Sequence, residues 1–123
     1  MKRQLTALLP AVAAVALTVP IGLATATPAA AAAPCGTVVS DRDGSSWVSG
    51  VDGVNMRSGS STSCAIPGVI YAHHSLDYHC YTAQSGATWT FIRNDTTDRQ
   101  GWVRDDLLPV RDGVRGSRVS CNI

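Results

Sequence analysis

The chain has 123 residues, with ten Lys and Arg, nine Asp and Glu, and four cysteines. Lys2 and Arg3 are the only charged residues before Asp41, so the chain beyond them carries eight Arg against nine Asp. This near-neutral balance gives no electrostatic reason to expect nucleic acid or an anionic membrane as a partner.

The first third of the chain has the layout of a secretory signal peptide. Lys2 and Arg3 give a positive start, Leu5 to Leu23 is uncharged and apolar, and Ala29 to Ala33 supplies Ala-x-Ala cleavage sites. We therefore expect residues 1–33 to be removed on export. The remaining secreted chain of about 90 residues is long enough for one domain with a small core.

Two other interpretations of this segment fit less well. A permanent membrane helix would need about this length of apolar sequence, but Pro10, Pro20 and Pro28 interrupt it. A lipid-modified Cys35 would make a lipoprotein, yet Pro34 before it is a poor fit to an attachment site, and acylation would leave an odd number of cysteines. We expect no membrane contact after cleavage.

Short apolar runs then alternate with turn residues. A polar, irregular lead-in occupies residues 34–49, with one short strand at Thr37–Ser40. The strands expected within residues 50–110 are Val51–Arg57, Ile66–Tyr71, Leu76–Thr82, Trp89–Arg93 and Gly101–Arg104. A tight turn at 105–108 and a tail, residues 111–123, complete the chain. This spacing of short strands predicts an all-β barrel or sandwich.

Four cysteines in a short exported chain predict two disulfides, and three connectivities are open. The competing hypothesis is a metal site, but no Cys-x-x-Cys pair is present. His73, His74 and His79 also give no metal set, because neighbouring strand positions point apart and turn histidines are usually exposed. We expect neither a metal nor another cofactor.

The residue pattern gives little indication of catalytic activity. A nucleophile set drawn from Cys80, His79 and Asp77 fails, because adjacent strand residues point to opposite faces and an oxidised cysteine is no nucleophile. With no Glu in the chain, a pair of acidic catalysts would have to be Asp alone. We therefore expect a protein that is not an enzyme.

Alternation along the strands predicts a candidate ligand surface. If Leu76, Tyr78, Ile92 and Val103 fill the interior, period 2 places four aromatic residues outside, and aromatic side chains are favoured at binding sites. The predicted surface consists of Tyr81, Trp89, Phe91 and Trp102, with Arg93 at its edge. The alternative is that Trp89 and Trp102 close the small barrel beneath the loops and the lead-in.

Two parts of the sequence resemble segments of bacterial SH3 domains. Residues 54–63 read VNMRSGSSTS, similar to the V-N-V-R-S-G-P-S-T opening of that family, and Ser60 stands where Pro is common. The segments 89–93 and 101–108 resemble the closing strands and terminal turn of the family. Cys64 and Cys80 are additions that resemble small secreted actinobacterial members.

The resemblance implies an SH3-like barrel of about five short strands, stapled by disulfides. Because such barrels bring their ends together, Cys35–Cys121 would tie the termini and Cys64–Cys80 would link neighbouring strands. The resemblance also implies a small, non-catalytic, monomeric module that binds cell-wall peptidoglycan. The alternative is a secreted factor that binds another secreted or cell-surface protein, as an inhibitor or signalling partner.

Overall fold

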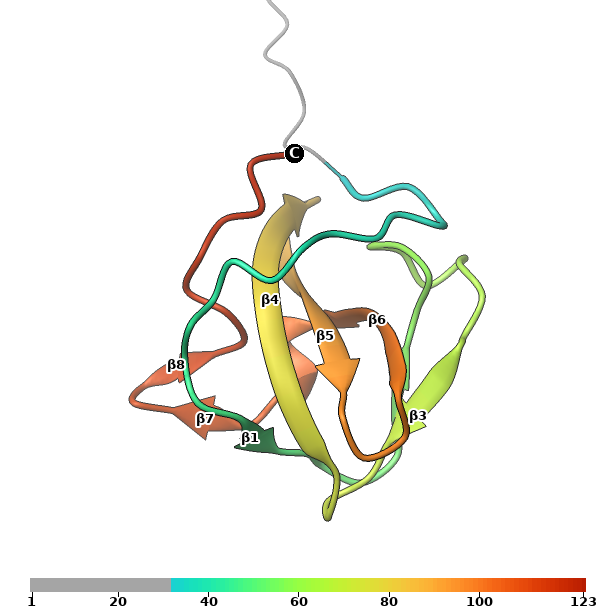
Figure 1. Ribbon diagram of the computed structural model, residues 1–123. Helices are drawn as coiled ribbons and strands as arrows, with labels where there is room; N and C mark the ends of the chain where they lie inside the picture. The colour runs from blue at the N-terminus through green and yellow to red at the C-terminus, as the bar shows by residue number, and fades with distance from the viewer. Residues whose placement is uncertain (1–31) are drawn as a thin grey trace, which may run out of the picture.

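In the computed structural model, the regular structure of residues 32–123 consists of strands and one 3-10 turn, Asp105–Leu107 (Figure 1). The structure describes residues 32–123, so the predicted signal peptide lies outside it except for its last two residues. The strands are β1 (Val48–Ser49), β2 (Val54–Met56), β3 (Gly68–Ile70), β4 (Ser75–Gln84), β5 (Ala87–Asn94), β6 (Arg99–Arg104), β7 (Val110–Arg111) and β8 (Val114–Arg115). Across residues 32–123, no helix has the length and apolar character needed to cross a bilayer.

The all-β expectation is confirmed, and each strand expected within residues 50–110 is present. The main sheet is antiparallel in the order β1-β4-β5-β6, and β2–β3 and β7–β8 are separate hairpins. Beyond β2, Arg57 and Trp102 of β6 exchange backbone hydrogen bonds of 2.8 and 2.6 Å. The strand expected at Thr37–Ser40 does not form, and the lead-in is irregular up to β1.

One face of the main sheet carries the larger hydrophobic core. Leu76, Tyr78, Ile92 and Val103 point into it, as alternation predicts, and β2 and β3 close it from the other side. Its fully or nearly buried members are Val54, Met56, Ile70, Leu76, Tyr78, Ile92, Val103 and Leu108.

A β-bulge at His79 interrupts the alternation of β4. Tyr78 pairs with Ile92, but Cys80, two residues later, pairs with Phe91. A bulge of one residue moves every later side chain to the opposite face. Cys80 therefore lies on the face opposite Tyr78, whereas unbroken period 2 would place the two together.

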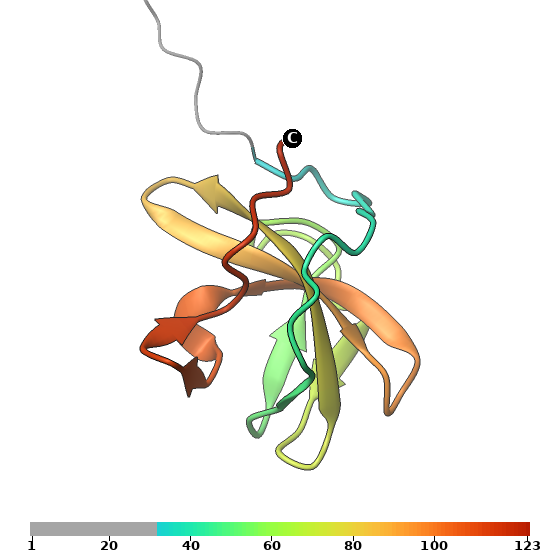
Figure 2. The same cartoon turned by 60° about the vertical axis from the view of Figure 1, so that its left-hand side comes forward.

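The second face of the sheet is also buried. It carries a smaller core made of Ala33, Cys80, Trp89, Phe91, Trp102 and Cys121. The lead-in runs across β4 on this side and the tail runs alongside β4, and the C-terminus lies close to the beginning of the described chain (Figures 1 and 2). The tail follows β4 by backbone hydrogen bonds to Tyr81, donated to Val119 at 2.8 Å and accepted from Cys121 at 2.9 Å.

Both predicted disulfide pairings are wrong, although the prediction of two disulfides is confirmed. The bonds are Cys35–Cys64 and Cys80–Cys121. Strand β3, which follows Cys64, pairs with β2 and not with β4, so Cys64 does not meet Cys80. The bulge instead turns Cys80 toward the tail.

The first disulfide fixes the lead-in to the loop after β2. Ala33 exchanges backbone and hydroxyl hydrogen bonds with Ser60, and a Cβ at Gly59 would lie 2.7 Å from the Ala33 carbonyl oxygen and the Cys35 nitrogen. Only glycine permits this close approach.

We predict that each disulfide contributes substantially to stability. The sequence separations are 29 and 41 residues, for which the chain-entropy estimate gives ~3.5 to 4 kcal/mol each. Urea unfolding of the paired Cys→Ala variants measures these losses. Peptide mapping without reduction should yield Cys35–Cys64 and Cys80–Cys121 peptides, and a Cys64–Cys80 peptide would contradict the arrangement.

Candidate functional site

Three of the four aromatic residues predicted to form a ligand surface are buried. Trp89, Phe91 and Trp102 lie side by side on the second face, as alternation predicts, but their exposed fractions are 6%, 1% and 0%. The lead-in and the tail cover them. The alternative interpretation, in which the tryptophans close the fold beneath the lead-in, is the one the structure supports.

Specific contacts hold the lead-in against the aromatic residues. The Trp102 indole nitrogen donates a hydrogen bond of 2.9 Å to the backbone carbonyl of Thr37 in the lead-in. The Phe91 ring lies edge-on to Trp102 at 5.1 Å, and the His79 ring lies 5.4 Å from Phe91 on the other side. The aromatic residues therefore anchor the lead-in and present no ring to a ligand.

The other two predicted site residues, Tyr81 and Arg93, also make contacts within the chain. Tyr81 comes after the bulge and pairs with Thr90, so it lies on the face opposite Trp89 and Phe91. It is half-buried, and its backbone pairs with the tail. The Arg93 guanidinium is exposed but donates to the carboxylates of Asp95 and Asp98. Arg93 is thus already neutralised, and the five predicted residues form no common binding surface.

A groove lies instead where the lead-in passes beside β4. This acidic groove has a volume of about 460 Å³ and is lined by Asp41, Asp43, Gly44, Ser45, Ser46, Trp47 and Asp77. Trp47 is 65% exposed, the highest value among the large hydrophobic residues of the described chain. An exposed indole beside carboxylates offers one apolar stacking surface together with several hydrogen-bond acceptors.

Local hydrogen bonds shape the lead-in along this groove. The backbone N–H of Asp43 donates to the Asp41 carboxylate at 3.0 Å, and the N–H of Ser45 donates to the Asp43 carboxylate at 2.8 Å. Such turns are what closely spaced Asp and Ser residues favour. The Ser117 hydroxyl of the tail also donates to Asp43, at 2.6 Å. Burial would raise the pKa of Asp43, but the hydrogen bonds from Ser117 and Ser45 outweigh it and leave the pKa lowered.

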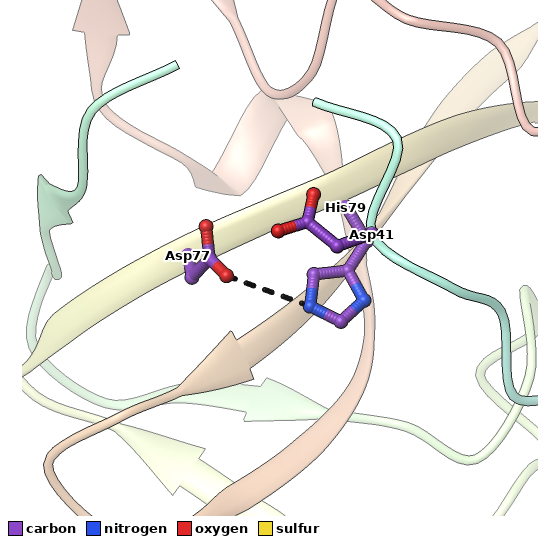
Figure 3. Close-up of side chains that lie close together, drawn as sticks. All are labelled: Asp41, Asp77 and His79. Carbon is purple, nitrogen blue, oxygen red and sulfur yellow. Dashed lines mark ion pairs between the residues drawn. The ribbon is translucent and has the colours of Figure 1, made fainter. Parts of the chain in front are cut away.

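Three titratable side chains converge at one edge of the groove. Figure 3 shows Asp77 and His79 projecting from β4 toward Asp41 on the lead-in. One ligand atom from each of the three lies within 4.8 Å of the others, and His79 Nε2 is 3.6 Å from Asp77 Oδ2. In the described part of the chain, this is the group whose geometry suits a shared cation.

The lead-in orients the His79 ring. His79 Nδ1 lies 3.2 Å from the backbone carbonyl oxygen of Val39, an acceptor, so this nitrogen carries the proton. Its Nε2 atom faces Asp77 Oδ2 at 3.6 Å. The backbone N–H of Arg42 donates to the His79 carbonyl at 3.0 Å, which fixes the lead-in on the bulge.

The two carboxylates repel one another. Burial raises the pKa of Asp77, and the negative charge of Asp41 raises it further, whereas attraction to His79 offsets only part of this shift. Asp95 adds a smaller repulsion. The ionised cluster thus favours a bound proton or cation.

The residues of this groove carry little signal in the sequence. Trp47 lies in the irregular lead-in, where no periodicity places its side chain, and nothing in the sequence pairs His79 with Asp41. His79 was expected to be an exposed turn residue, but it is buried, as is His74, which bonds to Tyr71 and Asn94. Period 2 does place Asp77 and His79 on one face, but the approach of Asp41 depends on tertiary structure.

Comparison with protein-family models, with curated proteins and with solved structures finds no match to this chain. The geometry of the groove therefore carries the functional argument.

We predict that Asp77→Asn stabilises the metal-free protein at neutral pH. A carboxyl whose pKa is raised on folding opposes folding once ionised, so the cost is absent below the ordinary value of 3.8 and grows as pH rises through and above it. Urea unfolding at about pH 3 and about pH 7 measures the difference.

The gain from Asp77→Asn should vanish at the lower pH, and Asp41→Asn should shift stability in the same direction because the repulsion is mutual. If Asp77→Asn is less stable than the parent at neutral pH, attraction to His79 outweighs the repulsion and this description of the cluster is wrong.

Proposed function

We propose that the chain is a secreted, non-catalytic module with an SH3-like barrel that binds cell-wall peptidoglycan in the acidic groove. The observation that carries the proposal is Trp47, which is exposed beside Asp41 and Asp77 on a scaffold fixed by two disulfides.

The arrangement of strands supports an SH3-like barrel. Short strands β2 to β6 follow one another in the order that the resemblance implies, and the 3-10 turn after β6 falls where its terminal turn is expected. The Arg57–Trp102 backbone pair extends β2 onto the edge of β6, so the hairpin β2–β3 curls over the first core. Arg57 also donates to the carbonyls of Thr62 and Cys64, which suits a structural role in the loop.

The cysteines support an extracellular location. The two disulfides are consistent with an oxidising compartment, and the described residues contain no free cysteine. They also argue against thiol catalysis, because Cys80, the nucleophile of the set considered above, is bonded to Cys121. A cleaved signal peptide would bring the chain to such a compartment.

The chemistry of the groove fits a glycan. The apolar face of a sugar ring stacks on an exposed indole, and its hydroxyl groups donate to carboxylates. Trp47 supplies the ring, while Asp41 and Asp77 supply acceptors along the same groove. Peptidoglycan also carries amino groups on its peptides, which a groove without a lining cation would attract.

A second candidate is a secreted factor that binds another protein. Its support is a group of exposed apolar side chains around β7 and β8: Leu107, Val110 and Val114, which are 46%, 56% and 36% exposed. Association with another protein would bury apolar side chains of this kind. This surface is separate from the acidic groove, so variants distinguish the two candidates.

We predict that Trp47→Ala weakens binding to purified peptidoglycan about thirtyfold, the loss of one good anchor at ~2 kcal/mol. Because Trp47 is exposed, the variant should unfold at the same urea concentration as the parent. A sedimentation assay with insoluble peptidoglycan measures the affinity.

Tyr71→Ala is the matched control, since Tyr71 is an exposed aromatic residue, 46% exposed, that does not line the groove. Its affinity should equal that of the parent. If the parent does not bind peptidoglycan, or if Trp47→Ala binds as tightly as the parent, the proposed ligand or the proposed site is wrong.

A further inference from the structure

We propose that Asp41, Asp77 and His79 form a zinc site that joins the lead-in to β4. The proposal goes beyond peptidoglycan binding and does not depend on it, because the site is defined by its three donors alone.

The distances suit a tetrahedral metal ion. Two ligand atoms bound to zinc at ~2.0 to 2.2 Å are themselves about 3.3 to 3.6 Å apart. His79 Nε2 and Asp77 Oδ2 are 3.6 Å apart, and donor atoms of all three residues lie within 4.8 Å of one another. A small inward movement of the exposed Asp41 carboxylate completes a set of three ligands.

The state of His79 is an independent indication of a ligand. The His79 side chain is 11% exposed, and its Nε2 atom is directed at the Asp77 carboxylate, 3.6 Å away. Its charged neighbour, Asp77, is at an ion-pair distance that exceeds that of a hydrogen bond. Nδ1 is oriented by the Val39 carbonyl, the arrangement in which a metal-binding histidine is usually held by its second nitrogen.

Each of the two carboxylates is positioned by the segment that carries it. Asp77 lies within β4, and Asp41 accepts the backbone N–H of Asp43. The hydrogen bond from Arg42 to the His79 carbonyl fixes the spacing between the two segments. Two carboxylates are thus brought together from distant parts of the sequence, and a divalent cation between them would relieve their repulsion.

The donor set selects the class of metal. Calcium and magnesium prefer oxygen ligands alone, whereas one imidazole with two carboxylates suits zinc. Arg93, opposite Asp77 in the sheet, is engaged by Asp95 and Asp98 and leaves the site accessible to a cation. Three protein ligands leave a fourth position open toward the groove.

Titration of the oxidised secreted chain with zinc chloride tests the proposal. Calorimetry should show one ion bound per chain, and the ring signals of His79 in nuclear magnetic resonance spectra should shift. Asp41→Asn, Asp77→Asn and His79→Gln should each lower the affinity at least about tenfold. Asp41→Asn is the most informative, because Asp41 is exposed and an Asn carbonyl can still accept from Asp43.

His73→Gln and Asp106→Asn are the matched controls, exposed residues of the same types outside the cluster. Their zinc affinity should equal that of the parent. The proposal is overturned if the parent binds no zinc at millimolar concentration, or if a correctly folded Asp41→Asn variant binds zinc as the parent does. Zinc binding without peptidoglycan binding would leave this proposal standing and refute the other.

Discussion

At His79, strand β4 contains one residue more than its partner β5, and this bulge brings Cys80 to the face of the sheet that carries Asp77. In a regular strand Cys80 would share the first core with Tyr78. The bulge instead directs it to Cys121, and the tail follows β4 from there. The carbonyl of His79, which lies in the irregular part of the ladder, accepts the N–H of the lead-in. Both segments that cover the second face therefore depend on this one irregularity.

A sheet buried on both faces changes where a ligand can bind. The aromatic residues of β5 and β6 are the contact area for the lead-in, and Trp102 anchors it through the Thr37 carbonyl. Covering them adds a second core to a chain too small to build one large core. The lead-in then becomes the exposed surface on this side. Its own aromatic residue, Trp47, and its carboxylate, Asp41, lie beside Asp77 of the sheet.

Local pattern was sufficient to predict strands β2 to β6, because short apolar runs between turn residues leave little choice of structure. It did not predict the two-residue strands β1, β7 and β8, and the strand that it predicted at Thr37–Ser40 does not form. It also predicted that Trp89, Phe91 and Trp102 share a face. It did not predict that this face is buried, since the lead-in has no periodicity and its position depends on a disulfide and a few backbone hydrogen bonds. A bulge has no clear sequence signal at His79, so the face of Cys80 and both disulfide pairings were wrong. Trp47 and Asp41 were missed because their neighbours are distant in sequence.

The exchange rates of the tryptophan indole protons, followed by nuclear magnetic resonance in deuterated buffer, test most directly whether the aromatic face is covered. Trp102 is fully buried and donates to Thr37, whereas Trp47 is 65% exposed. The Trp47 signal should disappear at once and the Trp102 signal should persist, with protection lost in the Cys80→Ala/Cys121→Ala variant. Exchange of Trp102 as fast as that of Trp47 in the parent protein would contradict it.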